Sequence, residues 1–416
     1  MTHPLRLVFW ETTKACNLTC RHCRAVPQRT LGPTELTTRR AFDLIDAIAE
    51  VAKPVMVLSG GEPLFRSDLF DIAEYGVQSG FRMALATNGT LITRRMAAKI
   101  ADVGFSRVAV SLDSANPATH DRFRGLPGAH AQAIHGILKL REEGISVQIN
   151  STIAKHNVGE IERILDMALG MGADALHLFM LVPVGCGLEI APAEMLSAEE
   201  YERVLHWFDE QSKSCPIDLK ATCAPHYYRI RAQRIELEHR RGDFRSTFIA
   251  PGTKAKAAPS LLHGGGHGQH LSAMTRGCLA GTSVCFISNE GAVYPCGYLP
   301  VAAGDTRVQR FADIWNHSDV FRLLRDPSAY EGKCGVCRYE AICGGCRARA
   351  YAATGSFLAE EPFCTYRPDL DQRLIATEEA RHDSQNEDGT PKWTPATDGA
   401  DRCGVAHPAL PRATEY

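Results

Sequence analysis

The sequence has no long hydrophobic run and no strong excess of charge of one sign. No apolar stretch of its 416 residues reaches the roughly 20 residues that a membrane span needs. The N-terminus also lacks the apolar core that is typical of a signal peptide. The formal net charge of −2 gives no general attraction to nucleic acids or membrane surfaces. We therefore expect a cytoplasmic protein that binds neither of them.

Cysteine, by contrast, is abundant, with 15 residues. Disulfides are rare in the cytoplasm, so this many cysteines there favours metal ligation. Their distribution supports the same interpretation, because three fall within residues 16–23 and eight within residues 278–364.

The first cysteine group consists of Cys16, Cys20 and Cys23, spaced C-x3-C-x2-C directly after the apolar run 5–10. Thiolates are the usual protein ligands of iron–sulfur clusters. Three thiolates leave one iron of a four-iron cluster without a protein ligand, which is an open position for a substrate or cofactor. A zinc site with His22 as fourth ligand is the alternative, as are three unrelated thiols.

Strand-like and helix-like segments alternate through the first half of the chain. The short apolar segments that predict strands are 5–11, 54–60, 82–88, 106–113, 146–153 and 175–183. The segments with helical periodicity are 38–51, 67–78, 93–103, 129–143, 158–169 and 197–213. Six such units in series predict an α/β fold with a parallel sheet, closed as a barrel or partial barrel. A doubly wound sheet is the alternative.

Polar motifs recur where these predicted strands end. They are Gly60-Gly61-Glu62-Pro63, Thr87-Asn88-Gly89, Ser111-Leu112-Asp113 and Asn150. Because barrel enzymes carry their chemistry at the carboxyl ends of the strands, we expect these groups to hold one cofactor. The paired glycines would let the backbone approach a ligand closely. In the alternative interpretation, Asn88 and Gly89 form only a turn, and Ser111 and Asp113 cap the next segment.

The cysteine spacing together with Ser59-Gly-Gly-Glu-Pro63 resembles the radical S-adenosylmethionine (SAM) superfamily. The resemblance implies a partial (β/α)6 barrel and a [4Fe-4S] cluster on Cys16, Cys20 and Cys23. SAM would bind the fourth iron through its amino and carboxylate groups. Its reductive cleavage, with electrons from a partner such as flavodoxin or ferredoxin, would give a 5′-deoxyadenosyl radical that takes a hydrogen atom from the substrate.

The same resemblance assigns residues to SAM. Residues 60–63 would contact its amino group, and Ser111 and Asn150 its carboxylate or ribose, with Asn88 at the same edge. Arg124 could pair with the SAM carboxylate, since a guanidinium suits that geometry, or could form only a surface ion pair.

The second cysteine group resembles the SPASM extension of radical SAM enzymes, which holds auxiliary iron–sulfur clusters. By that resemblance Cys278, Cys285, Cys296 and Cys346 would hold one cluster, and Cys334, Cys337, Cys343 and Cys364 another. Residues 291–296 would form a hairpin. Two residues, rather than the family's usual three, separate Cys343 from Cys346. Cys285 could equally belong to a buried strand, which would leave one full and one partial cluster, and zinc is again the alternative metal.

A basic segment begins at Pro225, which suits the first turn of a helix. Its residues Arg229, Arg231, Arg234, Arg240 and Arg241 would form a cationic wall for an anionic substrate, with His226 and Tyr227 as catalytic residues near the radical. In the alternative, the arginines face solvent and the tyrosine lies in the core. Cys186, Cys215 and Cys223 have no cysteine nearby in the sequence, which predicts small buried residues rather than ligands.

These patterns divide the chain into four parts. We expect the barrel in 1–240, a flexible Gly/His-rich linker or lid in 241–275, the SPASM domain in 276–370 and a disordered tail in 371–416.

Several segments resemble the haem-synthase branch of the superfamily. They are 9–13, 85–91, 178–183, 220–229 and 343–351. The branch converts two propionates of Fe-coproporphyrin III to vinyl groups and so produces haem b. One departure is Cys186, between two glycines, where the branch has arginine. A maturase of a ribosomally made peptide, another tetrapyrrole-modifying enzyme and a non-enzymatic electron carrier are the alternatives.

Overall fold

The computed structural model describes residues 3–240 and 277–368, and a single ten-stranded sheet runs through both ranges. The strand order is β10-β9-β8-β1-β2-β3-β4-β5-β6-β7. The strands are β1 (Leu7–Glu11), β2 (Val55–Ser59), β3 (Arg82–Thr87), β4 (Arg107–Ser111), β5 (Val147–Ile153), β6 (Ala175–Met180), β7 (Asp218–Thr222), β8 (Val284–Ile287), β9 (Ala292–Tyr294) and β10 (Gly304–Asp305). β1 to β7 are parallel, β8 is parallel to β1, and β9 and β10 return antiparallel.

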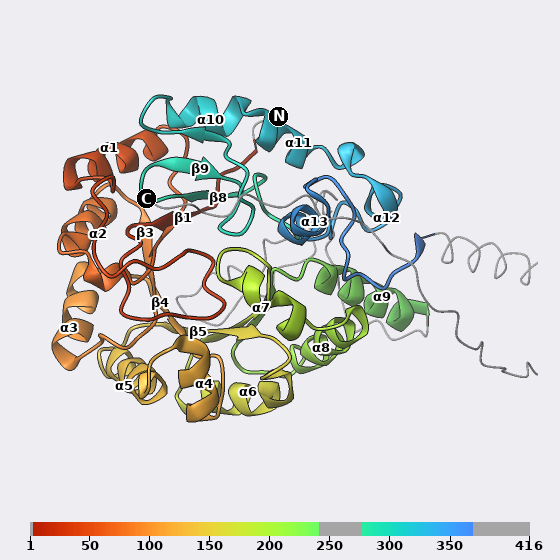
Figure 1. Ribbon diagram of the computed structural model, residues 1–416, viewed down its shortest axis with the longest axis horizontal. Helices are drawn as coiled ribbons and strands as arrows, with labels where there is room; N and C mark the ends of the chain where they lie inside the picture. Colours follow the sequence, from red (N-terminus) through yellow and green to blue (C-terminus); the bar gives the residue numbers. More distant parts are fainter. Residues whose placement is uncertain (1–2, 241–276, 369–416) are drawn as a thin grey trace, which may run out of the picture. The chain divides into compact units, whose positions relative to one another are not determined.

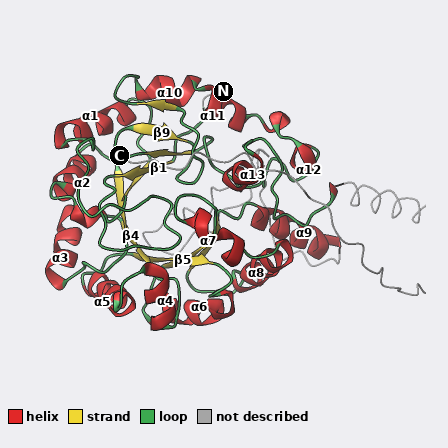
Figure 2. Ribbon diagram, in the orientation of Figure 1, coloured by secondary structure: helices red, strands yellow, loops and turns green. Residues whose placement is uncertain are grey.

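Helices form an arc outside the strands (Figure 1). Those of the first range are α1 (Thr38–Ala49), α2 (Leu69–Gln78), α3 (Arg94–Val103), α4 (Pro117–Arg124), α5 (Ala129–Glu142), α6 (Ile161–Gly170), α7 (Gly187–Glu194), α8 (Ala198–Gln211) and α9 (His226–Arg240). Those of the second are α10 (Phe311–His317), α11 (Asp319–Arg325), α12 (Gly332–Gly335) and α13 (Arg347–Thr354). Figure 2 shows the helices lying outside the strands of the sheet. No helix in either range is long and apolar enough to cross a bilayer.

The helix α1 illustrates how the local sequence produces this layer. The side chain of Thr37 accepts a hydrogen bond from the amide of Arg40, which satisfies one free donor at the helix start. Its apolar residues recur at helical spacing and are buried: Ala41, Leu44, Ile45 and Ile48. The apolar periodicity is as the sequence predicts.

The strands expose two different faces. In β5, Val147, Ile149 and Ile153 are buried in the core beneath the helices. The alternate residues Gln148, Asn150 and Thr152 face the other way, toward the interior of the curved sheet. The sheet therefore has an apolar outer face and a more polar inner one.

The α/β fold class and the partial barrel are confirmed. The strand order from β1 to β7 follows the chain without the reversal of a doubly wound sheet, so that alternative is wrong. All six predicted strands and six predicted helices are present. In the first range the sequence missed β7, α4 and α7, and in the second it missed β10 and the helices α10 to α13. The predicted linker (241–275) and tail (371–416) lie outside the described residues.

Candidate functional site

The loop that carries Cys16, Cys20 and Cys23 is held by the loops that follow the other strands. The Asn88 side-chain amide donates to Asn17 Oδ1 at 2.9 Å, and the Thr19 amide donates to the Arg124 carbonyl at 3.3 Å. From the other side, the amide of Cys186 donates to the carbonyl of Cys23 at 2.8 Å. The motifs that the sequence placed at one edge of the sheet therefore do meet there.

Gly60 and Gly61 bring the next strand end against the backbone of the cysteine loop. A Cβ on Gly60 would lie 2.5 Å from the Thr13 carbonyl oxygen, and one on Gly61 would lie 2.4 Å from that of Ala15. The amides of Gly61 and Glu62 donate to those same two carbonyls, each at 2.7 Å. Glycine is therefore required here for contact with the cysteine loop itself, whereas the sequence interpretation had a ligand in that place.

Glu62, between Gly61 and Pro63, fastens this strand end to the next. Its buried carboxylate accepts hydrogen bonds from the Thr87 hydroxyl and the Asn88 amide, both at 2.8 Å, and from the Leu64 amide at 3.2 Å. Burial outweighs these donors and raises the pKa of Glu62 to about 7.

Arg124 is buried and lies between Asp113 and a cysteine. Its Nε donates to Asp113 Oδ2 at 2.6 Å, and its Nη1 lies 3.8 Å from Cys20 Sγ. Although burial alone would raise the pKa of Asp113, the charge of Arg124 keeps it well below its usual range. The surface-ion-pair alternative for Arg124 is therefore wrong, and the SAM carboxylate contact stays a prediction.

The three thiols are suited to binding the positively charged iron ions of a cluster. Burial raises the pKa of Cys16 to about 11 and that of Cys23 to about 12, so both would be protonated at neutral pH without a metal. Iron ions would stabilise the thiolates. Nowhere in residues 3–240 or 277–368 do three His, Cys, Asp or Glu side chains lie close enough to hold a single metal ion. A cluster of several irons lies between its thiolates and needs them farther apart.

His22 is engaged elsewhere and does not act as a fourth zinc ligand. Its ring stacks on Phe123, with centroids 4.1 Å apart, and its Nε2 lies 3.9 Å from Asp113 Oδ2. Burial lowers the pKa of His22 to about 3.

Polar residues also stand next to the predicted cofactor residues in one row of register-paired positions across the sheet, called here the inner rung. The register pairs Ser111 with Asn150, Asn150 with His177, and His177 with Lys220. Burial lowers the pKa of both His177 and Lys220. The sequence interpretation missed Lys220 because it did not recognise β7. It predicted the strand that contains His177 but did not assign that residue to the site.

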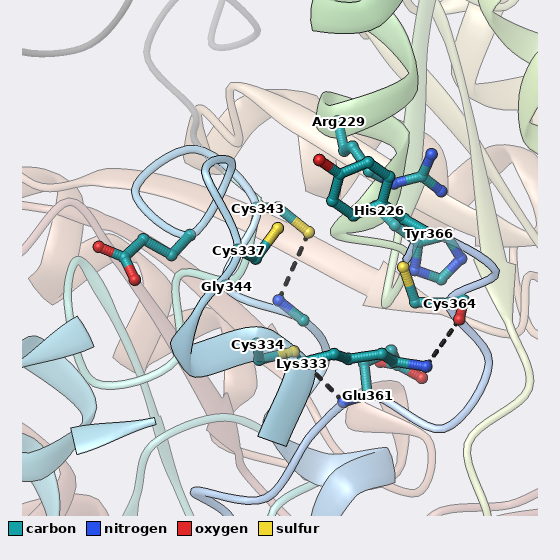
Figure 3. Close-up of a pocket in the computed structure, with 12 residues that line it drawn as sticks. His226, Arg229, Lys333, Cys334, Cys337, Cys343, Gly344, Glu361, Cys364 and Tyr366 are labelled. Carbon is teal, nitrogen blue, oxygen red and sulfur yellow. Dashed lines mark hydrogen bonds between the residues drawn. The ribbon is translucent and has the colours of Figure 1, made fainter. Parts of the chain in front are cut away.

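The second predicted cysteine set gathers around one cavity. Cys334, Cys337, Cys343 and Cys364 all line it, together with His226, Arg229 and Lys333 (Figure 3). Backbone amides support three of the thiols, because Glu361 donates to Cys334 at 3.4 Å, Tyr339 to Cys337 at 3.4 Å and Gly345 to Cys343 at 3.5 Å. These four residues fit the ligand set of an iron–sulfur cluster.

The structure does not place His226 and Tyr227 where the sequence predicted. His226 is buried at the cavity of the second cysteine set, and neither ring nitrogen has a hydrogen-bond partner. Tyr227 packs edge-on against Phe208, and its hydroxyl donates to Ser212 at 3.4 Å. These contacts give no support for a catalytic role of either residue, and that assignment stays a prediction.

The structure also contradicts part of the predicted cationic wall, because Arg229 and Arg234 are paired with carboxylates. Arg229 bonds both carboxylate oxygens of Glu202 at 2.6 Å. Arg234 pairs with Asp209 and Glu238. These charges are neutralised by carboxylates, two of them on α8, and are not free for an anionic substrate.

The other predicted cysteine set is divided. Cys296 and Cys346 pack in one apolar cluster with Leu299 and Ala348, and Cys223 packs there too. Cys285 lies in the separate core of the barrel, within β8, as the buried-strand alternative expected. The hairpin that leads to Cys296 is confirmed as β8 and β9.

Comparison with known proteins agrees with this geometry. The model of the radical SAM superfamily matches residues 10–168, and that of SPASM, an iron–sulfur cluster-binding domain, matches residues 278–346. The AdoMet-dependent heme synthase of Methanosarcina barkeri is 48% identical over 368 residues, which cover 88% of this chain and 98% of that protein. The AdoMet-dependent heme synthase of Oleidesulfovibrio alaskensis is 43% identical, over 87% of this chain and 88% of that protein.

A solved structure shares the fold. The crystal structure of Streptococcus suis SuiB bound to S-adenosylmethionine superposes with a TM-score of 0.62 over 88% of this chain and 76% of that one. The sequence identity is 16%.

Proposed function

This chain belongs to the radical SAM superfamily and carries a SPASM domain, and we propose on that basis that it is a haem synthase. It decarboxylates two propionates of Fe-coproporphyrin III to vinyl groups and so gives haem b. The observation that carries this is the 48% identity to a heme synthase over 98% of that protein's length. The fold alone would not separate this activity from a peptide maturase, and no contact in the described residues favours the latter.

Cys16, Cys20 and Cys23 would hold the [4Fe-4S] cluster that binds SAM, and the SPASM cysteines would hold auxiliary clusters. When bound, the first cluster and SAM supply the 5′-deoxyadenosyl radical that takes a hydrogen atom from a propionate. Loss of CO2 and one electron then leaves the vinyl group. That electron needs an acceptor, and the buried cysteine cavity beside His226 suits one.

The chain's own residues prepare this site. The hydrogen bonds of Glu62 and the close contact of Gly60 and Gly61 fix the cysteine loop against two strand ends. Arg124 places a positive charge beside Cys20, which stabilises a thiolate there.

The inner rung supplies the best candidates for binding carboxylates. Lys220 pairs in register with His177, which pairs with Asn150, and both Lys220 and His177 are only partly exposed. Desolvation lowers the pKa of both side chains. An ammonium that has lost part of its hydration is stabilised by a carboxylate partner, which either SAM or a propionate would provide. Lys220 therefore replaces the arginines of α9 as the expected anion-binding residue.

Two finer points belong to the proposal. The reducing partner would be a low-potential carrier such as flavodoxin or ferredoxin. The location would be the cytoplasm, where the many free cysteines stay reduced.

The direct test is an anaerobic reaction of reconstituted protein with SAM, a reductant and Fe-coproporphyrin III. We expect haem b, CO2 and 5′-deoxyadenosine, and none of them from Cys16→Ala. Formation of 5′-deoxyadenosine without haem b or CO2 would reject the substrate while leaving the superfamily chemistry intact.

A further inference from the structure

We propose that Cys223, rather than Cys285, completes the auxiliary ligand set formed by Cys278, Cys296 and Cys346. The inference rests on the auxiliary clusters of a SPASM domain and does not depend on which substrate the enzyme uses.

Cys285 faces the wrong side of the sheet. β8 pairs in parallel with β1, and Cys285 stands directly opposite Val8, which is fully buried in the helix-covered core. Cys285 is itself 0% exposed in that core. The following residue, Phe286, faces the other way, and Arg24 lies over its ring at 4.2 Å. A thiol fixed by strand register among apolar side chains has no room for a cluster beside it.

Cys223 lies at the opposite end of the sheet order but reaches the remaining cysteines. It follows β7 directly, at the same edge as the other strand-end loops. It packs against the apolar cluster that includes Cys296 and Cys346. The Tyr201 hydroxyl donates to its carbonyl at 2.7 Å and so fixes its backbone.

The backbone of Cys223 is in a conformation that proteins reserve for special positions. Its φ is 55°, and within the two described ranges no other non-glycine residue has a positive φ. A side chain other than glycine is strained in this region, and such strain is concentrated at functional sites. A role as a cluster ligand would account for this strained backbone at a cysteine.

The charges at this position agree with four thiols that share one site. The thiols of Cys346, Cys296 and Cys278 all lie near enough to Cys223 to interact with it electrostatically. In the described residues, the charged group that interacts in this way with Cys285 is Arg325, not a cysteine. Iron ions would stabilise four thiolates gathered at one site with little water, as they would those of the second set.

A cluster held by four protein thiolates has no open iron. This auxiliary cluster would therefore transfer electrons and would not bind the substrate through a metal position.

The test uses full-length protein in which Cys16, Cys20 and Cys23 are alanine, so that only auxiliary clusters are assembled. Iron and sulfide content and the EPR spectrum of the reduced protein are measured with and without cyanide, a small ligand for an open iron. In this background, and with Cys285→Ala added, we expect about eight irons per chain and no effect of cyanide. With Cys223→Ala added, we expect either about four irons or a spectrum that cyanide changes.

Cys223→Ser keeps the size and offers an oxygen ligand, so it provides a second measurement if the alanine variant does not fold. We expect it to shift the EPR g values of one cluster. Unchanged iron, spectrum and cyanide response in both Cys223 variants would overturn the proposal, as would loss of iron from Cys285→Ala alone.

Discussion

The two described regions of the chain are stabilised in different ways. Residues 3–240 form long helices over an apolar sheet face, and one continuous core fills the space between them. Residues 277–368 contain short elements, down to the four residues of α12. Parts of β8, β9, α10 and α11 join that same core, whereas the segment around the cysteines at 334–364 buries Arg347, Arg349 and Glu361. The first region is thus organised mainly by apolar burial, with a few buried ion pairs, whereas the cysteine-bearing part of the second depends more on polar contacts and, in the holoenzyme, on metal ligation.

The buried charges of the second region lie among its cysteines. Arg349 Nε donates to Glu361 Oε1 at 2.9 Å, and Glu361 Oε2 accepts from the amide of Cys346 at 2.7 Å. Arg347 donates to the Ala359 carbonyl at 2.7 Å and lies 3.6 Å from Cys334 Sγ. Loops without regular structure thus obtain fixed positions through two arginines and one carboxylate.

The largest effect should come from a change in the first cysteine loop, and it should affect the chemistry without changing the stability of the barrel. Cys16→Ala is expected to reduce SAM cleavage below detection, because the cluster loses one of three ligands. The melting temperature of the barrel should change little, since the core beneath the helices does not include this loop. 5′-Deoxyadenosine formation and thermal unfolding are the two measurements. Retained cleavage would contradict the assigned ligand.

Removal of iron should destabilise one region more than the other. After oxidation and chelation, we expect residues 277–368 to lose hydrogen-exchange protection while the strands β2 to β5 keep theirs. The reason is that metal binding contributes folding free energy where ligands come from poorly ordered loops. Equal loss in both regions, measured by exchange and mass spectrometry, would show that the difference between them does not exist.

Arg349→Met tests the buried ion pair of the second region. It leaves Glu361 as an unpaired buried charge and should lower the free energy of unfolding by about 3–5 kcal/mol. Arg322→Ala, which removes the exposed pair with Asp319, is the matched control and should cost less than about 1 kcal/mol. Denaturant titration checks both, and similar losses would show that burial of the pair has no special role.

The smallest effect concerns Glu62, the buried carboxylate of the barrel region. Its folded pKa of about 7 lies above the unfolded value, so its contribution to stability is complete at low pH and is lost as pH rises through 7. Stability should therefore fall with pH between about 4.5 and 7 more steeply in the wild type than in Glu62→Gln. Identical slopes in urea titrations across this window would rule out a proton on Glu62.

The difference between the regions also decides what the sequence could predict. Apolar periodicity was enough for most helices and strands of the barrel, and the resemblance to the SPASM extension was enough for the set of Cys334, Cys337, Cys343 and Cys364. β7 was missed because Lys220 interrupts its apolar pattern.

Predictions that depended on partners far apart in the sequence were less successful. The pairing of Arg229 with Glu202 joins two helices, and nothing in the basic segment indicates it. Cys223 is separated from Cys278 by 54 intervening positions, so spacing could not reveal that they share a site. Strand register, which separates Cys285 from its expected companions, likewise exists only in three dimensions.

The parallel pairing of β8 with β1 has a consequence for electron transfer. β1 leads into the first cysteine loop, and β8 begins shortly after Cys278. One ladder of backbone hydrogen bonds therefore links the segments that carry ligands of two redox centres. The tunnelling distance between them would be set by a rigid sheet rather than by a hinge, and the rate should not depend on how the two halves of the enzyme move.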